Sequence, residues 1–250
     1  MPVLMSIIIP VYDVAPHLDV VLDALLQFVP HLAGSTEVIL VDDGSPHRHF
    51  QGLTESYPIR YAYMDPPSPA FRAGQARNLG ASLAGGERLL FLDSDCRPDA
   101  SSLRVHQELG AQPVVLAGGI TVLDDPEHFT GLHGDRRYQL YNLKSQLIQG
   151  EPLTLTDYRP FWSGNLSVPR KQFVELGGFW EELMEYGSED QELAWRMREA
   201  GCTLQLDLRY PVTHLGPQRS QRPASHRLEV LARSRAQPSL VRPGRYLPPV

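Results

Sequence analysis

The stretch RLLFLDSDCRPD, residues 88–99, holds an apolar run that stops abruptly at two aspartates separated by one serine. Residues 88–92 have the length of a buried strand. Asp93 and Asp95 follow where such a strand would leave the carboxyl edge of a sheet, the usual ligand edge of open α/β folds. Two carboxylates two residues apart suit Mg²⁺ or Mn²⁺ carrying a diphosphate. Turn and helix-cap chemistry accounts for the same aspartates equally well, so the decision rests with the remaining sequence.

The composition is that of a globular protein with an uneven charge. The chain has 250 residues and is 42% hydrophobic, enough to bury the core of one large domain, with or without an appendage. The net charge of -6 gives no sign of nucleic-acid binding. Residues 217–250 nevertheless hold seven arginines and one glutamate, which predicts a basic tail on an acidic body.

The two cysteines, the start of the chain and the apolar runs all favour a cytoplasmic protein. Cys96 and Cys202 have no metal-ligand spacing and require no oxidising compartment. No secretory signal precedes the first expected strand, and no apolar run approaches the roughly 20 residues that span a bilayer. We therefore expect a soluble, cytoplasmic protein.

Strands and helices alternate along the first half of the chain. Apolar runs predict strands over 4–9, 37–41, 59–64 and 88–92, and helical spacing predicts helices over 16–28, 71–83 and 99–110. This alternation predicts an α/β fold with a doubly wound, mainly parallel, Rossmann-like sheet whose polar loops gather at one edge. Asp42, Asp43, Asp93 and Asp95 all fall on that edge.

The second half is less regular, and we expect it to add a small sheet and helices to the first. The pattern predicts a strand over 114–122 and two short strands before His214, over 203–208 and 210–213. It also predicts an amphipathic helix over 136–148 and a helix from 189 to about 200. We expect the Pro- and Arg-rich tail from residue 217 to be loosely ordered.

Seven segments in order resemble the family 2 glycosyltransferases of the GT-A fold. They are SIIIPVYD (6–13), EVILVDDGS (37–45), AGQARNLG (73–80), LLFLDSD (89–95), SGNLSVPR (163–170), GGF (177–179) and SEDQELAWRMREAG (188–201). The resemblance implies one glycosyltransferase domain over 1–216, with a nucleotide-binding half over about 1–112 and an acceptor half over about 113–216. It also implies transfer of a sugar from a nucleotide-sugar to an acceptor hydroxyl, with inversion at the anomeric carbon.

The resemblance assigns the nucleotide to the first half of the chain. Pro10, Tyr12 and Asp43 match positions that hold the base and ribose, with Asp43 accepting from a uracil ring, which favours a UDP-sugar. An Asx-turn is the alternative role for Asp43. Arg72 and Arg77 are placed to reach the base or diphosphate with a guanidinium fork, although a surface ion pair is about as plausible for Arg77.

Asp93, Ser94 and Asp95 match the metal-and-ribose triplet of this family, its DXD motif. The resemblance implies that Asp95 binds the metal directly and that Asp93 lies nearer the ribose or a metal-bound water. His214 resembles an additional metal ligand near the end of the domain, while a structural role is equally open for a lone histidine. The implied cofactor is Mn²⁺ or Mg²⁺, which neutralises charge on the departing nucleoside diphosphate.

Glu189 and Asp190 match the ED motif of the family, which implies that Asp190 is the general base and that Glu189 helps to hold the acceptor. Two acids in the first turn of a helix also stabilise its dipole without any catalytic role. Trp162, Gly164 and Asn165 match a segment between the donor and acceptor sites. Trp162 is suited either to stacking on a sugar or to the core.

Two other classes of protein compete with this interpretation. A sugar-phosphate nucleotidyltransferase also uses paired aspartates, but it usually has a glycine-rich basic loop after the first strand, and PVYDVAP (10–16) is neither. An inactive nucleotide-sugar-binding protein is disfavoured by the intact Asp93, Asp95 and Asp190.

For the active enzyme we expect a role in polysaccharide or glycoconjugate biosynthesis. The expected acceptor is a carbohydrate or a lipid-linked one. The basic tail is suited to contact with the inner face of an anionic membrane.

Overall fold

The computed structural model describes residues 4–13, 15–29, 36–65, 72–122, 151–183, 188–216, 232–236 and 239–242. The helix expected over 136–148 lies outside these residues. Within the described ranges, no helix is long and apolar enough to cross a membrane.

The first half of the chain forms the parallel part of the sheet, as the sequence predicts. The strands lie in the order β3-β2-β1-β4, and each neighbouring pair is parallel. Their bounds are β1 Met5–Val11, β2 Thr36–Asp42, β3 Arg60–Tyr63 and β4 Arg88–Leu92. The connections contain α1 Leu18–Phe28, the 3₁₀ helix η2 His49–Glu55 and α2 Ala73–Leu83, and α3 Ala100–Gln107 follows β4.

The second half extends the same sheet, so the expectation of a small additional sheet is wrong. β8 lies antiparallel between β4 and β6 and joins the two halves into one nine-stranded sheet. The two short strands expected before His214 are one long strand, β9, parallel to β6. The remaining bounds are β5 Cys96–Arg97, β6 Val114–Val122, β7 Leu153–Leu155, β8 Asn165–Pro169, α5 Arg170–Glu175, α6 Glu189–Glu199 and β9 Thr203–His214.

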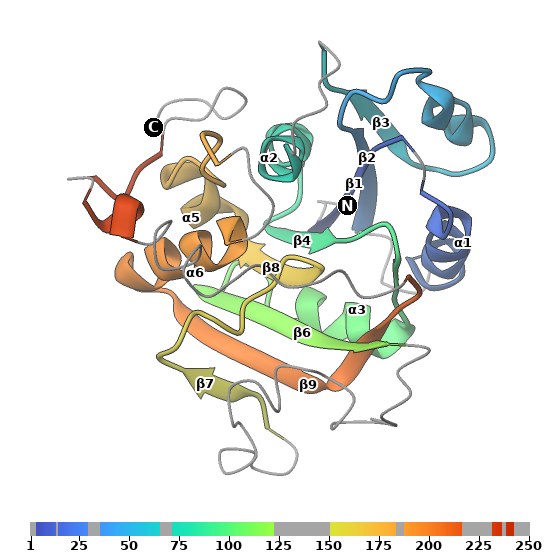
Figure 1. Ribbon diagram of the computed structural model, residues 1–250. Coiled ribbons are helices and arrows are strands. Elements are labelled where there is room, and N and C mark those ends of the chain that lie inside the picture. Colours follow the sequence, from blue (N-terminus) through green and yellow to red (C-terminus); the bar gives the residue numbers. More distant parts are fainter. Residues whose placement is uncertain are drawn as a thin grey trace.

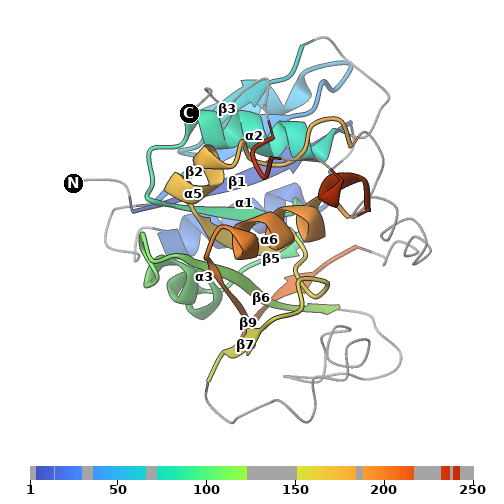
Figure 2. The same cartoon turned by 90° about the vertical axis from the view of Figure 1, so that its left-hand side faces the viewer.

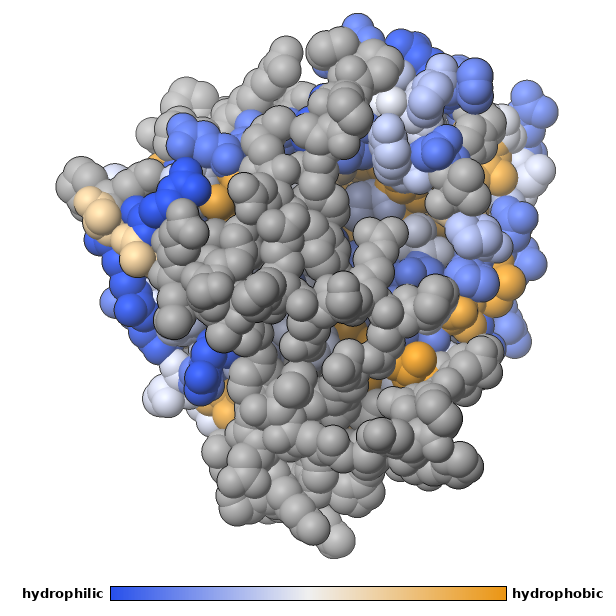
Figure 3. All heavy atoms as spheres, viewed as in Figure 1, coloured by the Kyte–Doolittle hydropathy of each residue, from blue (hydrophilic) through white to orange (hydrophobic). Residues whose placement is uncertain are grey.

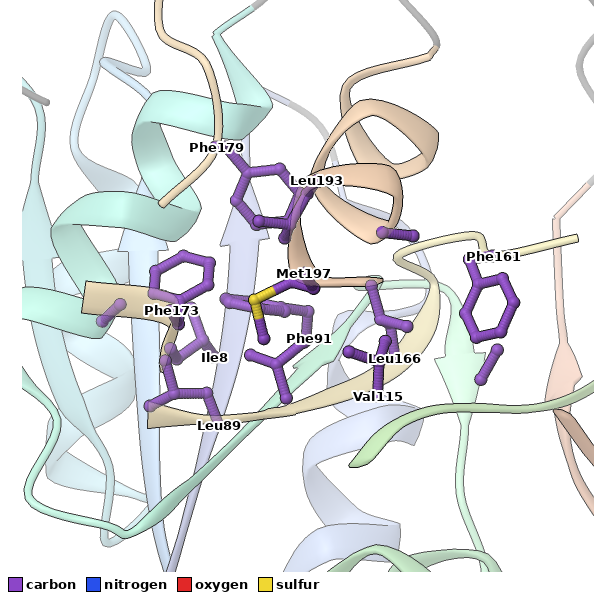
Figure 4. Close-up of a cluster of buried hydrophobic side chains, with 14 of the residues drawn as sticks. Ile8, Leu89, Phe91, Val115, Phe161, Leu166, Phe173, Phe179, Leu193 and Met197 are labelled. Atoms are coloured by element: carbon purple, nitrogen blue, oxygen red, sulfur yellow. The ribbon is translucent and has the colours of Figure 1, made fainter. Parts of the chain in front are cut away.

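Alternating side chains of the strands fill two cores, one on each face of the sheet. Ile8 and Phe91 belong to the first core, with residues of α2, α5 and α6, and Ile7 and Leu90 belong to the second, with α1 and α3. Figures 1 and 2 show these helices on the two sides of the strands. The close-up of the first core shows Phe173 and Phe179 beside Phe91 (Figure 4), with ring centroids 5.0 to 5.7 Å apart in the three pairs. This core fixes α2 and α6 above the sheet.

A chain of hydrogen bonds lies buried between α3 and the middle of the sheet. Arg88 donates to the Ser167 hydroxyl (3.1 Å), which bonds Nδ1 of His106 (2.8 Å), and Nε2 of His106 bonds Oδ1 of Asn165 (2.9 Å). Asn165 then donates to the Gly119 carbonyl (3.0 Å). Burial, followed by the nearby Arg88 charge, lowers the pKa of His106 to about 4, so the ring is neutral. A neutral ring that accepts at Nδ1 and donates at Nε2 satisfies every link in one direction.

On the surface, hydrophilic side chains predominate among the residues that Figure 3 colours, and apolar ones are scattered between them. The exposed large hydrophobic side chains among the described residues are spread over several segments and include Tyr12, Val20, Leu83 and Tyr210. On this face the described residues therefore form no large apolar patch, and the polar edge of the sheet is the place to seek a site.

Replacing Arg88 tests the buried network. Its guanidinium also donates to the carbonyls of Gly110, Gln112 and Val114. Arg88→Met therefore removes four hydrogen bonds, of which those to the Val114 carbonyl and the Ser167 hydroxyl are buried. We expect a loss of about 3 kcal/mol in the free energy of unfolding, measured by urea denaturation. The matched control is Arg104→Met, an exposed arginine of α3, which should change it by less than about 0.5 kcal/mol. Equal midpoints for the two variants would contradict this account.

Candidate active site

The carboxyl ends of β1 and β2 form the first part of the site. The two aspartates there, Asp42 and Asp43, have different roles. Asp42 is fully buried and makes the turn: it accepts from the Ser45 N–H (2.7 Å) and from the Tyr61 hydroxyl (2.8 Å). Asp43 donates its N–H to the Val11 carbonyl (2.8 Å), which leaves its carboxylate available to other groups. The carboxylate that accepts a backbone hydrogen bond in this turn is therefore that of Asp42, three residues before Ser45, and not that of Asp43.

Arg72, at the start of α2, holds the Asp43 carboxylate. Its Nε lies 2.9 Å from Asp43 Oδ1, and its Nη2 donates to the Asp43 carbonyl (2.9 Å). Burial raises the pKa of Asp43 to about 6 against the opposing effect of Arg72. Of the other residues expected here, Tyr12 is 45% exposed and Pro10 is half-buried, so both border the solvent beside this pair.

Strand pairing brings the triplet that follows β4 next to a residue 119 positions later. β5 pairs antiparallel with the end of β9, and Cys96 is the partner of His214. As a result His214 Nε2 lies 3.4 Å from Asp95 Oδ2. Ser94 is half-buried in the turn between Asp93 and Asp95.

The chemistry of this contact fits a cation. The Gly216 carbonyl lies 2.8 Å from Nδ1 of His214 and can only accept, so Nδ1 carries a hydrogen. In the neutral ring, Nε2 is then an acceptor that faces the Asp95 carboxylate, and two acceptors at this distance need a proton or a metal ion between them. A second hydrogen bond that fixes the other nitrogen is typical of metal-binding histidines. The ligand atoms of Asp93, Asp95 and Cys96 lie within 4.8 Å of one another, so a divalent cation fits here.

Arg77, in the first half of α2, joins this triplet to the start of α6. Its Nη2 donates to Asp93 Oδ1 (2.9 Å), and its Nη1 lies 3.4 Å from Glu189 Oε1. The Arg77 side chain is only 5% exposed and its guanidinium lies 5.6 Å from the centre of the Phe179 ring. The surface ion pair considered for Arg77 is therefore wrong, because small residues around it on α2 let it face the interior.

Glu189 and Asp190 point to different partners. Glu189 is buried against Arg77, and the contact with the acceptor expected for it stays a prediction. Asp190 is half-buried and accepts from the Ser163 N–H (3.1 Å) and the Gln191 N–H (2.8 Å). Burial, followed by the neighbouring Glu189 charge, raises the pKa of Asp190 to about 7, against the Ser163 N–H and Arg77, which lower it. A carboxyl group with this pKa is suited to taking a proton near neutral pH.

The segment before β8 connects the Asp190 and Asp93 carboxylates. Gly164 accepts from the Asp93 N–H (3.3 Å), and a Cβ at Gly164 would lie 3.0 Å from Asp93 Oδ2. Trp162 is half-buried beside it. Asn165 is 1% exposed and its amide is engaged by His106 and Gly119, and the sugar contact expected for it stays a prediction. These hydrogen bonds of Asn165 hold the chain directly after Gly164 in place.

Two features of the site were not predicted from the sequence. The Ser163 contact uses a backbone N–H, which no side-chain pattern reveals. The interior position of Arg77 does have a signal, because Gly74, Asn78 and Ala81 share its buried side of α2.

The sequence matches two family models. Residues 6–167, more than half of the chain, match the model for glycosyl transferase family 2, and residues 154–214 match one described as the N-terminal domain of galactosyltransferase. Together the matches cover residues 6–214, which include Asp43, Asp93, Asp95, Asp190 and His214.

Curated relatives of the chain are named as glycosyltransferases. The chain is 26% identical to validoxylamine A glucosyltransferase of Streptomyces hygroscopicus, over 80% of this chain and 53% of the relative. It is 27% identical to human polypeptide N-acetylgalactosaminyltransferase 10, over 78% of this chain and 35% of the relative. The chain thus spans about half or less of the length of these two relatives.

Two solved structures share the fold. A crystal structure of GalNAc-T7 with UDP, GalNAc and Mn²⁺ superposes with a TM-score of 0.67 at 17% identity, over 93% of this chain and 47% of that one. Residues 1–349 of S. aureus TarS superpose with a TM-score of 0.59 at 17% identity, over 92% of this chain and 69% of that one. These structures show the GT-A fold, and the family model that covers more than half of the sequence establishes that the chain belongs to glycosyl transferase family 2.

Proposed function

We propose that this protein transfers a sugar from a UDP-sugar to an acceptor hydroxyl with inversion, and that Asp190 is the general base. The observation that carries the proposal is the bridge through residues 163–164: Ser163 holds the Asp190 carboxylate, and Gly164 abuts Asp93. Asp190, which is suited to removing a proton, and Asp93, which is suited to binding the donor, therefore lie on either side of residues 163–164. When an acceptor hydroxyl attacks the anomeric carbon, the base and the donor-binding group must both lie within reach of the same sugar.

In this proposal each part of the sheet edge binds one part of the donor. Asp43, held by Arg72, accepts from the uracil ring, and Asp93 lies on the ribose side. Asp95 and His214 would hold Mn²⁺ or Mg²⁺, which supplies Lewis-acid stabilisation of the leaving diphosphate. A solved structure with the same fold, GalNAc-T7, contains UDP and Mn²⁺, which supports a UDP-sugar donor and a divalent metal for this chain. Asp190 accepts the proton of the acceptor hydroxyl as the new bond forms.

The relatives support a broad acceptor class only. One is named for validoxylamine A, another for a polypeptide, and a third is a chondroitin synthase. The molecules in these names differ, so they do not narrow the acceptor. The proposal for this chain is therefore a carbohydrate or glycoconjugate acceptor.

The base assignment predicts the effect of Asp190→Asn. With the donor chosen from a screen of UDP-sugars and GDP-mannose with Mn²⁺, we expect transfer to fall about 10²- to 10⁴-fold, with UDP affinity unchanged. The wild type should also lose kcat/KM below about pH 7, because protonation removes the base. Asp19→Asn, at an exposed position of α1, is the control. Full activity of Asp190→Asn, or release of pyrophosphate from a nucleoside triphosphate and a sugar phosphate, would exclude the mechanism.

Asp43 predicts a pH dependence for nucleotide binding. Its ionised form accepts from the uracil ring, and its pKa of about 6 means that this form disappears as the pH falls through 6. UDP affinity, measured by calorimetry with Mn²⁺ from about pH 5 to 8, should therefore weaken toward tenfold per pH unit on the acid side. Asp43→Asn should bind more weakly but without this dependence. A dependence that persists in Asp43→Asn would assign it to another group.

Arg77 predicts a shift of the pH profile. Because Arg77 lowers the pKa of Asp190, Arg77→Met should move the acid limb of kcat/KM to higher pH and reduce kcat by about 10²-fold. Arg72→Met is the matched control: it should weaken UDP binding and leave the acid limb in place. Superimposable limbs for wild type and Arg77→Met would contradict a link between Arg77 and the base.

A further inference from the structure

The described C-terminal residues, 232–236 and 239–242, form a segment that we call the C-terminal strap. Figures 1 and 2 both show it beside α5 and α6. Leu240 packs against the core that contains Phe173 and Met197, and Arg242 is only 1% exposed. This part of the tail is therefore folded onto the domain, in contrast to the loosely ordered tail expected from its composition.

The strap docks through its backbone as well as its side chains. The Arg242 N–H donates to the Leu176 carbonyl (2.9 Å). Gly177 has φ +78°, and a Cβ there would lie 1.6 Å from the Arg242 carbonyl oxygen. The absence of a side chain at Gly177 is thus what lets the strap approach this closely.

A buried carboxylate on α6 is shared between two guanidiniums. Glu192 is fully buried and accepts from Arg196 at 2.7 to 3.0 Å, and Arg242 Nε lies 3.5 Å from Glu192 Oε1. Ser234 donates to the same Glu192 oxygen (2.6 Å) and accepts from Arg242 Nη2 (2.6 Å). Arg196 alone already neutralises Glu192, so charge balance does not require Arg242. Its buried charge calls for a different explanation.

The shared carboxylate lies in the first turn of α6, the turn that carries Asp190. Ser188, the residue before this turn, has φ +84° and makes no side-chain cap hydrogen bond. A non-glycine residue in this conformation is strained and persists only when surrounding contacts hold it. Arg242 and Ser234 reach Glu192 from outside the helix and provide such contacts.

We propose that the C-terminal strap positions the general base: through Arg242 and Ser234 it holds Glu192, and with it the first α6 turn, so that Asp190 stays at the Ser163 N–H. This inference rests on the proposed function of Asp190. Arg242 is a positioning residue, because it acts through Glu192 and not on the substrate.

The test uses the full chain with Arg242→Met. The change leaves the balanced Glu192–Arg196 pair inside the protein, so the variant should fold. We expect kcat to fall about 10- to 100-fold at a temperature well below its unfolding midpoint, while the Kd for UDP with Mn²⁺ stays that of the wild type. Arg242→Lys keeps the charge and should recover part of kcat. Arg233→Met, an exposed arginine of the same strap, makes the same charge change and should behave as wild type.

Two results would overturn the proposal. A lower unfolding temperature with unchanged kcat would make the strap a stabilising element only. A parallel loss of kcat and UDP affinity would mean that Arg242→Met damages the site as a whole.

Hydrogen exchange separates this proposal from the proposed function. If the wild type transfers no sugar from any donor, the function fails, but exchange at residues 189–193 still reports on the strap. Arg242→Met should speed exchange there and leave α2 unchanged. Equal exchange rates in wild type and Arg242→Met would dispose of the strap as a restraint on α6.

Discussion

The Arg77 guanidinium lies between Asp93 and Glu189, and the geometry of the site depends on this bridge. The two carboxylates come from different halves of the fold, one after β4 and the other at the start of α6. Without a cation between them, two carboxylates in a partly buried place would repel each other. Phe179 lies near the guanidinium. Asn78, the next residue of α2, donates to the Phe179 carbonyl and accepts from the Phe179 N–H. The bridge therefore ties α2, α6 and the end of β4 into one unit.

Sheet topology supplies the second constraint. Because β8 runs antiparallel to β4, its first residue, Asn165, lies opposite Leu92, so residues 163–164 reach the same edge as Asp93. The short β5 then turns back to pair with the end of β9 and brings His214 to Asp95. Each new pairing adds one group to an edge already formed by the parallel strands. This arrangement explains how residues from four distant segments meet without a long loop among the described residues.

The parallel half of the fold was predictable because its strands are apolar runs bounded by turn residues, as in 88–92 before Asp93. β8 was not predicted as a strand, because NLSVP mixes polar and apolar residues, and its polar side chains bond Arg88 and His106 inside the protein. Asp43 and Asp93 follow β2 and β4 at the expected edge, and Asp190 lies at the expected start of a helix, where it accepts from the Ser163 N–H. Their partners could not be read from the sequence, because a backbone donor such as Ser163 leaves no side-chain pattern. The order of residues 232–236 and 239–242 could not be predicted for a similar reason. The composition of the tail shows seven arginines, but it does not show that Arg242 faces a buried Glu192.

The distribution of charge within the site bears on the metal. Arg72 already balances Asp43, and in the described part of the site Arg77 faces the carboxylates of Asp93 and Glu189, with those of Asp95 and Asp190 close by. A donor diphosphate would add further negative charge beside Asp93 and Asp95. Coulomb repulsion between such groups grows as water is excluded, so nucleotide binding at this edge is unfavourable unless a cation joins it. The contact between Asp95 Oδ2 and His214 Nε2 at 3.4 Å is compatible with the same cation, since a proton or a metal ion between the two atoms satisfies both. Charge balance and the geometry of this contact thus both support the proposal that a divalent cation is part of the donor complex.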